Sequence, residues 1–167
     1  WDRLNGMMLG LAIGDALGRT SEPLLPADRF ARHGEVRDYL PNRNAADRRV
    51  GTPSDDTQLA FWTLEQMIAD RGFVPERVAH CFTQRHIFGV GGTVKAFLRN
   101  HKAGVRPWYR CGVKSAGNGA LMRIAPMVIP HAFTATSELW VDTALSAMIT
   151  HNDSASISAC LAFVGQL

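Results

Sequence analysis

The chain has 167 residues, of which 46% are hydrophobic and 20% charged, and its formal net charge is +3. These values are typical of a single globular domain, residues 1–167, with a hydrophobic core. The basic residues are scattered and do not form the concentrated patch of a nucleic-acid-binding protein. No window contains the roughly 18 apolar residues that a membrane-spanning helix needs. We therefore expect neither nucleic acid nor a membrane as a partner, and the oligomeric state stays open.

Helical patterns dominate the sequence, and strand-like alternation is almost absent. We expect helices over residues 4–17, 58–70, 75–85, 93–100, 120–128, 137–150 and 154–167. Pro126 should kink or break the fifth of these. Residues 20–54 contain several prolines and read as one long irregular stretch, which in a compact domain is typically functional or disordered. The pattern predicts a mainly helical protein.

The cysteines and the chain ends indicate the setting of the protein. Cys81, Cys111 and Cys160 are widely spaced and form no C-x-x-C pair. This spacing favours a reducing compartment and a cytoplasmic location over a disulfide framework. The sequence begins at Trp1 and ends in an apolar helical pattern without a polar tail. We interpret it as the N-terminal portion of a longer domain.

The first helical segment carries Asp15 among glycines and apolar residues, with Glu22 just after it. A buried aspartate is rare unless it has partners, so we expect Asp15 to bond backbone groups or a nearby charge. Glu22 lies close enough to reach a site. A solvated loop acid is the simpler interpretation of Glu22 when it is considered alone.

A hydroxyl and two adjacent carboxylates, Ser54, Asp55 and Asp56, stand before the segment 58–70. Ser before an apolar helix is an ordinary N-cap, and acids in the first turn suit the helix dipole. The same oxygen groups are also the ligands that Mg²⁺ and Mn²⁺ prefer. The motif alone favours the cap.

Two glycine-rich loops follow. Gly89, Gly91 and Gly92 precede Thr93 at a predicted helix start, where free backbone N–H groups can face an anion. A flexible connector is an equally good interpretation. The second loop carries polar residues beside glycines and is open to a ligand; its members are Ser115, Gly117 and Asn118.

Two further polar residues lie in apolar surroundings. Arg123 needs a carboxylate partner, for which Asp15 or Glu22 would serve. His151 lies in a connection between two helices, where Asn152 or Asp153 would cap the final helix. Taken singly, His151 is more typical of a structural histidine than of a catalytic one.

In combination and order, these motifs closely resemble the ADP-ribosylglycohydrolase family, over residues 4 to about 163. This group includes dinitrogenase-reductase-activating glycohydrolase and the ADP-ribosyl-acceptor hydrolases. The matching motifs are G-x-x-x-G-D-A-x-G with a following Glu, S/T-D-D-T, G-x-G-G-T, S-x-G-N-G-x-x-M-R and T-H. The resemblance implies an all-α, compact multi-helix bundle with a cleft that holds two divalent cations, Mg²⁺ or Mn²⁺.

The resemblance also implies roles for individual residues. Ser54, Asp55 and Asp56 correspond to metal ligands, and Glu22 to an acid near the scissile bond. The substrate-binding positions are Gly89, Gly91, Gly92, Thr93, Ser115, Gly117, Asn118 and His151. The implied reaction is hydrolysis of the glycosidic bond between ADP-ribose and a modified protein or small molecule. A metal-activated water attacks ribose C1″, and Asp55, Asp56 and Glu22 are the catalytic residues.

One departure from the family pattern matters. The family takes its remaining metal ligands from a C-terminal D-x-D-T motif, and this sequence has no D-x-D. Half of the dinuclear ligand set is therefore missing from this chain. We expect the chain alone to bind cations weakly and to hydrolyse little or nothing.

Alternative functions remain open at this point. One is a non-catalytic structural or ADP-ribose-binding relative, as in crystallins of the J1 type, although a structural protein has no need for the acidic motif. A more distant one is a phosphate-ester hydrolase. The acceptor (arginine, serine, an acetyl ester or a nucleobase) and the choice between Mg²⁺ and Mn²⁺ also stay open. Candidates for stacking on adenine are Phe88, Trp108 and Tyr109.

Overall fold

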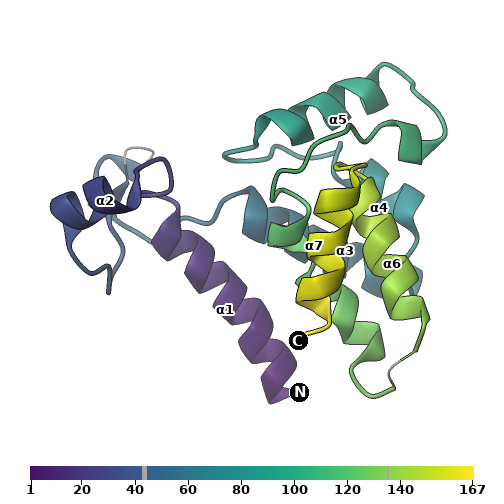
Figure 1. The fold of residues 1–167 in the computed structure, drawn as a ribbon, viewed down its shortest axis with the longest axis horizontal. Helices are drawn as coiled ribbons and strands as arrows, with labels where there is room; N and C mark the ends of the chain where they lie inside the picture. Colours follow the sequence, from purple (N-terminus) through teal and green to yellow (C-terminus); the bar gives the residue numbers. More distant parts are fainter. Residues whose placement is uncertain (43–44, 135) are drawn as a thin grey trace.

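The computed structural model describes residues 1–42, 45–134 and 136–167. Its regular structure is almost entirely helical, which confirms the expected all-α class (Figure 1). The α-helices are α1 (Asp2–Gly18), α2 (Pro26–His33), α3 (Asp55–Asp70), α4 (Pro75–Cys81), α5 (Gly92–Lys102), α6 (Glu138–Met148) and α7 (Ser154–Val164). Short 3₁₀ segments are η2 (Trp108–Arg110), η3 (Leu121–Arg123) and η4 (Ala125–His131). Two short strands, β1 (Pro41–Asn42) and β2 (Arg48–Arg49), pair antiparallel.

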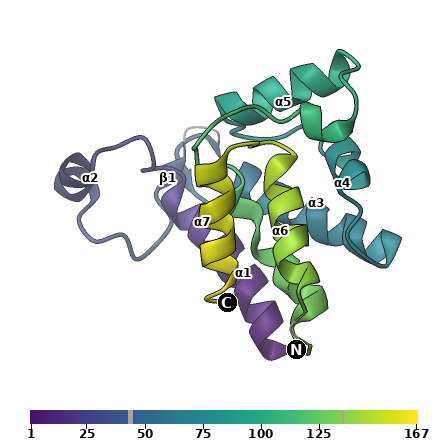
Figure 2. The same cartoon turned by 45° about the vertical axis from the view of Figure 1, so that its right-hand side comes forward.

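Helix α3 carries the hydrophobic core on two sides. Leu59 packs with Phe82 and Phe97, which come from the α4 and α5 region. Met67, near the C-terminal end of α3, packs with residues of η3, η4, α6 and α7 such as Met127. Burial of each such side chain contributes about 1.5–3 kcal/mol. Because both hydrophobic clusters include residues of α3, this helix connects the two parts of the core. Helices α6 and α7 lie side by side (Figure 2) and contact η4 and η3, which in turn contact α3.

Helix α1 projects away from this bundle, and α2 lies beyond its end (Figure 1). Helix α1 contacts α3 and η4 along one side. On the other side Leu9 and Ile13 are exposed. Across the described residues, α1 and every other helix fall short of the length and apolar character that a membrane crossing requires.

The helix boundaries differ from the sequence expectations in ways that matter for the site. Helix α3 begins at Asp55 rather than at residue 58, so the acidic pair belongs to its first turn. The segment expected over 120–128 divides at Ile124 into η3 and η4, since Pro126 has no N–H to continue a helix and starts a new one instead.

The expectation of one irregular stretch over residues 20–54 is wrong for its first half. Helix α2 begins with Pro26 at its first position and ends before Gly34, whose φ is 63°. Proline at a helix start and glycine past its end are both recognisable signals. The part of that expectation concerning Arg43 and Asn44 lies outside the described residues.

Candidate active site

Asp15 joins helix α1 to the start of helix α3. Its carboxylate accepts hydrogen bonds from the backbone N–H of Ser54 (2.6 Å) and of Thr57 (3.2 Å). It also accepts from the hydroxyls of Ser54 (2.7 Å) and Thr57 (2.6 Å). The expectation that Asp15 bonds backbone groups is confirmed. A carboxylate from one helix thus caps another and fixes the position of the acidic pair.

Ser54 is the N-cap residue of α3, as the simpler interpretation of the motif predicted. Its Oγ accepts from the backbone N–H of Asp56 at 3.4 Å. The same Oγ lies 2.7 Å from Asp15 Oδ1 and 2.8 Å from Asp56 Oδ2. A hydroxyl has one proton to donate. One of these two carboxylate contacts therefore needs an additional proton or cation.

The acidic pair carries negative charge in an unfavourable place. Burial and then the neighbouring charge of Asp56 raise the pKa of Asp55, while backbone N–H groups, including that of Gly91, act in the opposite direction. Burial and the charge of Asp15 likewise raise the pKa of Asp56, against the hydrogen bond from Ser54. A bound cation would relieve this crowding of carboxylates.

Hard oxygen donors of this kind fit Mg²⁺ or Mn²⁺ in chemical type. They do not fit in number, because such ions take about six oxygen ligands. Within the described part of the chain, no group of three or more His, Cys, Asp or Glu side chains is arranged to hold a metal ion. The residues present therefore match one side of a cation site.

Residues from five separate segments of the chain line one cavity of about 250 Å³, which we call the site cavity. Of the residues expected to form the site, those on its wall are Glu22, Asp55, Asp56, Gly89, Gly91, Gly92, Thr93, Gly117, Asn118 and His151. Ser54 and Ser115 lie one contact behind this wall. Ser54 contacts Asp56, and Ser115 Oγ lies 3.0 Å from Thr93 Oγ1. The structure thus brings the predicted residues together.

The wall also contains residues that sequence reasoning did not assign to the site, namely Val94, Gly119 and Met122. Gly119 is needed because of its neighbour. A Cβ at this position would lie 2.7 Å from Cε1 and 3.0 Å from Nε2 of His151. The imidazole therefore rests directly against the second glycine-rich loop.

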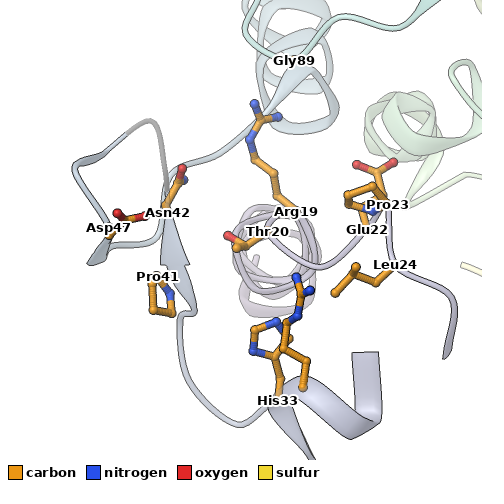
Figure 3. A pocket seen from close by; sticks show the side chains of 11 residues that line it. Arg19, Thr20, Glu22, Pro23, Leu24, His33, Pro41, Asn42, Asp47 and Gly89 are labelled. Atoms are coloured by element: carbon orange, nitrogen blue, oxygen red, sulfur yellow. The ribbon is translucent and has the colours of Figure 1, made fainter. Parts of the chain in front are cut away.

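Arg19 is a second residue that the sequence did not single out. Its side chain extends from the end of α1 toward Gly89 (Figure 3), and a Cβ on Gly89 would overlap its guanidinium group. Gly89 has φ +77°, which also favours glycine. The positive charge of Arg19 lowers the pKa of both Asp55 and Asp56, although burial outweighs it. No pattern in a single sequence marks this arginine.

A larger cavity of about 670 Å³, the outer cavity, adjoins the site cavity and shares Glu22 and Gly89 with it. Its wall includes Arg19, His33 and Asp47 (Figure 3). Glu22 is exposed to solvent where the two cavities meet. A ligand that spans both cavities would pass Glu22.

The expected partner of Arg123 is wrong. Its guanidinium is fully buried and bonds to Ser146 and Thr150, not to Asp15 or Glu22. The carboxylate of Asp15 is taken up by the start of α3, and Glu22 is exposed. Ser146 lies in the last turn of α6, where carbonyl groups and the negative end of the helix dipole replace a carboxylate.

The candidates for stacking on adenine do not line the site cavity as described. Phe88 is exposed beside Gly89, whereas Trp108 and Tyr109 belong to η2. Trp108 lines a separate cavity of about 450 Å³ with His80 and His101. Their role in binding stays a prediction. Asp153, by contrast, caps α7 as expected, because its Oδ1 accepts from the N–H of Ala155 at 2.9 Å.

Comparison with known proteins gives one consistent result. Residues 1–166 match the family described as ADP-ribosylglycohydrolase. The chain is 33% identical to an uncharacterized protein of Archaeoglobus fulgidus, with 96% of this chain and 53% of that protein covered. It is 30% identical to the ADP-ribosylarginine hydrolase Tri1 of Pseudomonas putida (99% and 46% covered). It is 32% identical to the ADP-ribosyl-[dinitrogen reductase] glycohydrolase of Rhodospirillum rubrum (96% and 55% covered).

Comparison of structures gives the same family as comparison of sequences. A solved structure described as an ADP-ribosylglycohydrolase-related protein complex superimposes with a TM-score of 0.77 at 29% sequence identity. The match covers 98% of this chain and 54% of that chain. The chain thus spans about half the length of the relatives that it matches.

Proposed function

Because the chain belongs to the ADP-ribosylglycohydrolase family, we propose that it serves hydrolysis of the glycosidic bond between ADP-ribose and a modified acceptor. The observation that carries this proposal is the meeting of the acidic pair, both glycine-rich loops and His151 around one cavity. Two relatives are named for ADP-ribosylarginine and for ADP-ribosyl-dinitrogen reductase. Protein arginine is accordingly the acceptor that we propose first.

The chemistry of the wall suits this reaction. Cleavage at ribose C1″ passes through an oxocarbenium-like state that water attacks, and Asp55 and Asp56 would contribute through the cation that they hold. Glu22, at the border of the two cavities, is placed to exchange a proton with water or with the leaving group. The glycine-rich loops, with Thr93 and Asn118, would hold the ribose and pyrophosphate in the site cavity.

Ser54, Asp55 and Asp56, at the start of α3, would hold a divalent cation. When bound, Mg²⁺ or Mn²⁺ would supply positive charge that polarises oxygen ligands of the substrate or water. This chain's own contribution is to hold two carboxylates at the start of α3, where Asp15 fixes their position. Metal dependence is part of the proposal.

The first test is ADP-ribose binding, measured by calorimetry with AMP as the matched control ligand. We expect ADP-ribose to bind more tightly than AMP, because the wall of the site cavity would contact the second ribose, which AMP lacks. Equal affinity for both ligands, or none, would contradict the proposal and favour the non-catalytic structural alternative.

The second test is turnover of ADP-ribosylarginine with Mg²⁺, with Mn²⁺ and with a chelator. We expect little turnover by this chain, and complete loss in Asp55→Asn, which keeps the fold but removes a charge. Turnover that resists the chelator would reject the metal-dependent mechanism. Turnover of a phosphate ester in its place would favour the phosphatase alternative.

A further inference from the structure

Arg123 is a buried cation whose charge points to a role beyond packing. It is fully buried, and burial lowers its pKa only to about 10, so it remains charged at neutral pH. Its Nη1 donates to Ser146 Oγ at 3.1 Å. Its Nη2 donates to the Ser146 carbonyl and to Thr150 Oγ1, each at 2.9 Å. The ring of Phe82 lies 5.1 Å from the guanidinium carbon.

The hydroxyl of Thr150 connects this cation to His151. Thr150 is fully buried, and its Oγ1 lies 2.9 Å from Nδ1 of the imidazole. A guanidinium can only donate, so Thr150 Oγ1 accepts from Arg123 and still has its own proton to place. Over the described residues, Nδ1 is the acceptor within hydrogen-bond distance of that hydroxyl. Because an unpaired buried hydroxyl is unfavourable, Thr150 donates to Nδ1.

This assignment fixes the proton of the neutral imidazole on the other nitrogen. An Nδ1 that accepts a hydrogen bond carries no proton, so the proton lies on Nε2. Nε2 is the ring atom near the second glycine-rich loop, 3.0 Å and 3.6 Å from Cβ positions built on Gly119 and Gly117. Both glycines line the site cavity together with His151. The Nε2–H edge is therefore the edge at the ligand side.

The backbone around His151 is held by the chain that precedes the loop. Val113 N–H donates to the Thr150 carbonyl at 3.1 Å, and Asn152 N–H donates to the Val113 carbonyl at 3.0 Å. These two bonds form a short parallel bridge between Val113 and His151. The orientation of the ring is thus set from both sides, by backbone and by Thr150.

We propose that Arg123 and Thr150 are positioning residues that hold His151 as a neutral imidazole with Nε2–H toward the site cavity. His151 then donates a hydrogen bond to an acceptor oxygen of the ligand, a hydroxyl or a phosphate oxygen, and does not act as a general base. The identification of that ligand as ADP-ribose rests on the proposed function. The assignment of the proton does not.

The charges around the ring agree with this assignment. Arg123 lies behind the ring, Asp153 follows two residues later, and Glu22, Asp55 and Asp56 share the cavity wall with it. Burial and then Arg123 lower the pKa of His151 to about 4, against the effect of Asp153. A second positive charge beside Arg123 is unfavourable, so the imidazole stays neutral near pH 7.

The test is NMR of the ring nitrogens in the chain labelled with ¹⁵N-histidine, with His151→Gln to assign the signal. We expect a neutral ring with the proton on Nε2, unchanged between pH 8 and pH 5.5. Thr150→Val keeps the shape and removes the hydroxyl, so Nδ1 loses its hydrogen bond and its ¹⁵N chemical shift should change. This variant should also weaken ADP-ribose binding about fivefold, the effect of one hydrogen bond. Thr150→Ser restores the hydroxyl and should restore both properties.

The proposal is overturned if the wild-type ring carries its proton on Nδ1, or if Thr150→Val leaves both the ¹⁵N shift of Nδ1 and ADP-ribose binding unchanged. The expected tautomer without any ADP-ribose binding would support the positioning role and contradict the proposed function. Amide spectra of Thr150→Val and Thr150→Ser confirm that both variants are folded, so a loss of binding can be attributed to the missing hydroxyl.

Discussion

At the scale of single residues, burial in the site shifts the pKa values of ionisable side chains away from their ordinary values. His151 is 2% exposed and neutral beside a buried cation, and Asp55 is 7% exposed beside a second carboxylate. In the unfolded chain, His151 would take up a proton more easily and Asp55 would lose its proton more easily. The fold therefore gives up stability at these positions, which is common where side chains are arranged for ligand binding.

His151 makes this cost measurable through pH. Its pKa is about 4 in the folded chain and about 6.5 when unfolded, so only the unfolded chain takes up the proton between these values. Stability is complete above pH 6.5, falls as the pH drops toward 4, and then levels off. The loss should reach about 2 kcal/mol at pH 5.

Urea unfolding at pH 7 and pH 5 measures this effect. We expect His151→Gln to show a smaller drop between the two pH values than the wild type, whatever its stability at pH 7. His86→Gln, at an exposed position away from Arg123, serves as the matched control and should keep the full drop. Equal drops in wild type and His151→Gln would contradict the prediction.

At the scale of elements, the start of α3 depends on a carboxylate from α1. Asp15 satisfies two backbone N–H groups and two hydroxyls there, a function that N-cap side chains usually perform locally. The position of the acidic pair, and with it the wall of the site cavity, therefore depends on the contact between these two helices.

Asp15→Ala should lower the free energy of unfolding by about 2 kcal/mol, the upper range for the loss of a helix cap. Hydrogen exchange should increase at the N–H groups of Ser54 and Thr57, which lose their acceptor. The core of α3 near Leu59 should stay protected. Asp2→Ala, which removes an exposed acid from the first turn of α1, is the control. It should cost less than about 1 kcal/mol and leave hydrogen exchange at Ser54 and Thr57 unchanged. Protection of Ser54 and Thr57 in Asp15→Ala would show that another group caps α3.

The elements also show what the sequence could and could not predict. Helical periodicity and capping residues located α3, α6 and α7 to within a few residues, because these signals are local. The role of Asp15 followed from the rarity of unpaired buried acids. The partners of Arg123 could not be derived, since Ser146 and Thr150 come close to it only after α6 packs beside η3. Arg19 was missed for the same reason: its contact with Gly89 joins two segments 70 residues apart.

At the scale of the whole molecule, the site cavity forms where α1, the start of α3, both glycine-rich loops and the connection before α7 meet. The grouping of the predicted residues is a property of the packed bundle, although each motif was visible in the sequence. Asp55 and Asp56 supply two carboxylates to this cavity, with the hydroxyl of Ser54 behind its wall. The chain covers about half the length of its relatives.

Cation binding follows from this number of ligands. With two carboxylates instead of a complete oxygen shell, Mn²⁺ should bind with a Kd on the order of 1 mM. Asp56→Asn should remove the binding, because it takes away one of two charges. It should also raise the stability of the cation-free chain at neutral pH, since burial and Asp15 raise the pKa of Asp56. A raised carboxyl pKa means that stability increases as the pH falls through it, and the neutral amide reproduces the protonated state.

The matched control is Asp70→Asn at the other end of α3. There, hydrogen bonds from Gln66 and Arg77 lower the pKa of the carboxyl, so its charge stabilises the fold and lies away from the site cavity. Asp70→Asn should leave Mn²⁺ binding intact and lower stability, the reverse of Asp56→Asn on both measurements. Relaxation of water protons by Mn²⁺ and thermal unfolding without metal measure the two effects separately. Micromolar Mn²⁺ binding by the chain alone would mean that these two carboxylates are not the whole of its cation site.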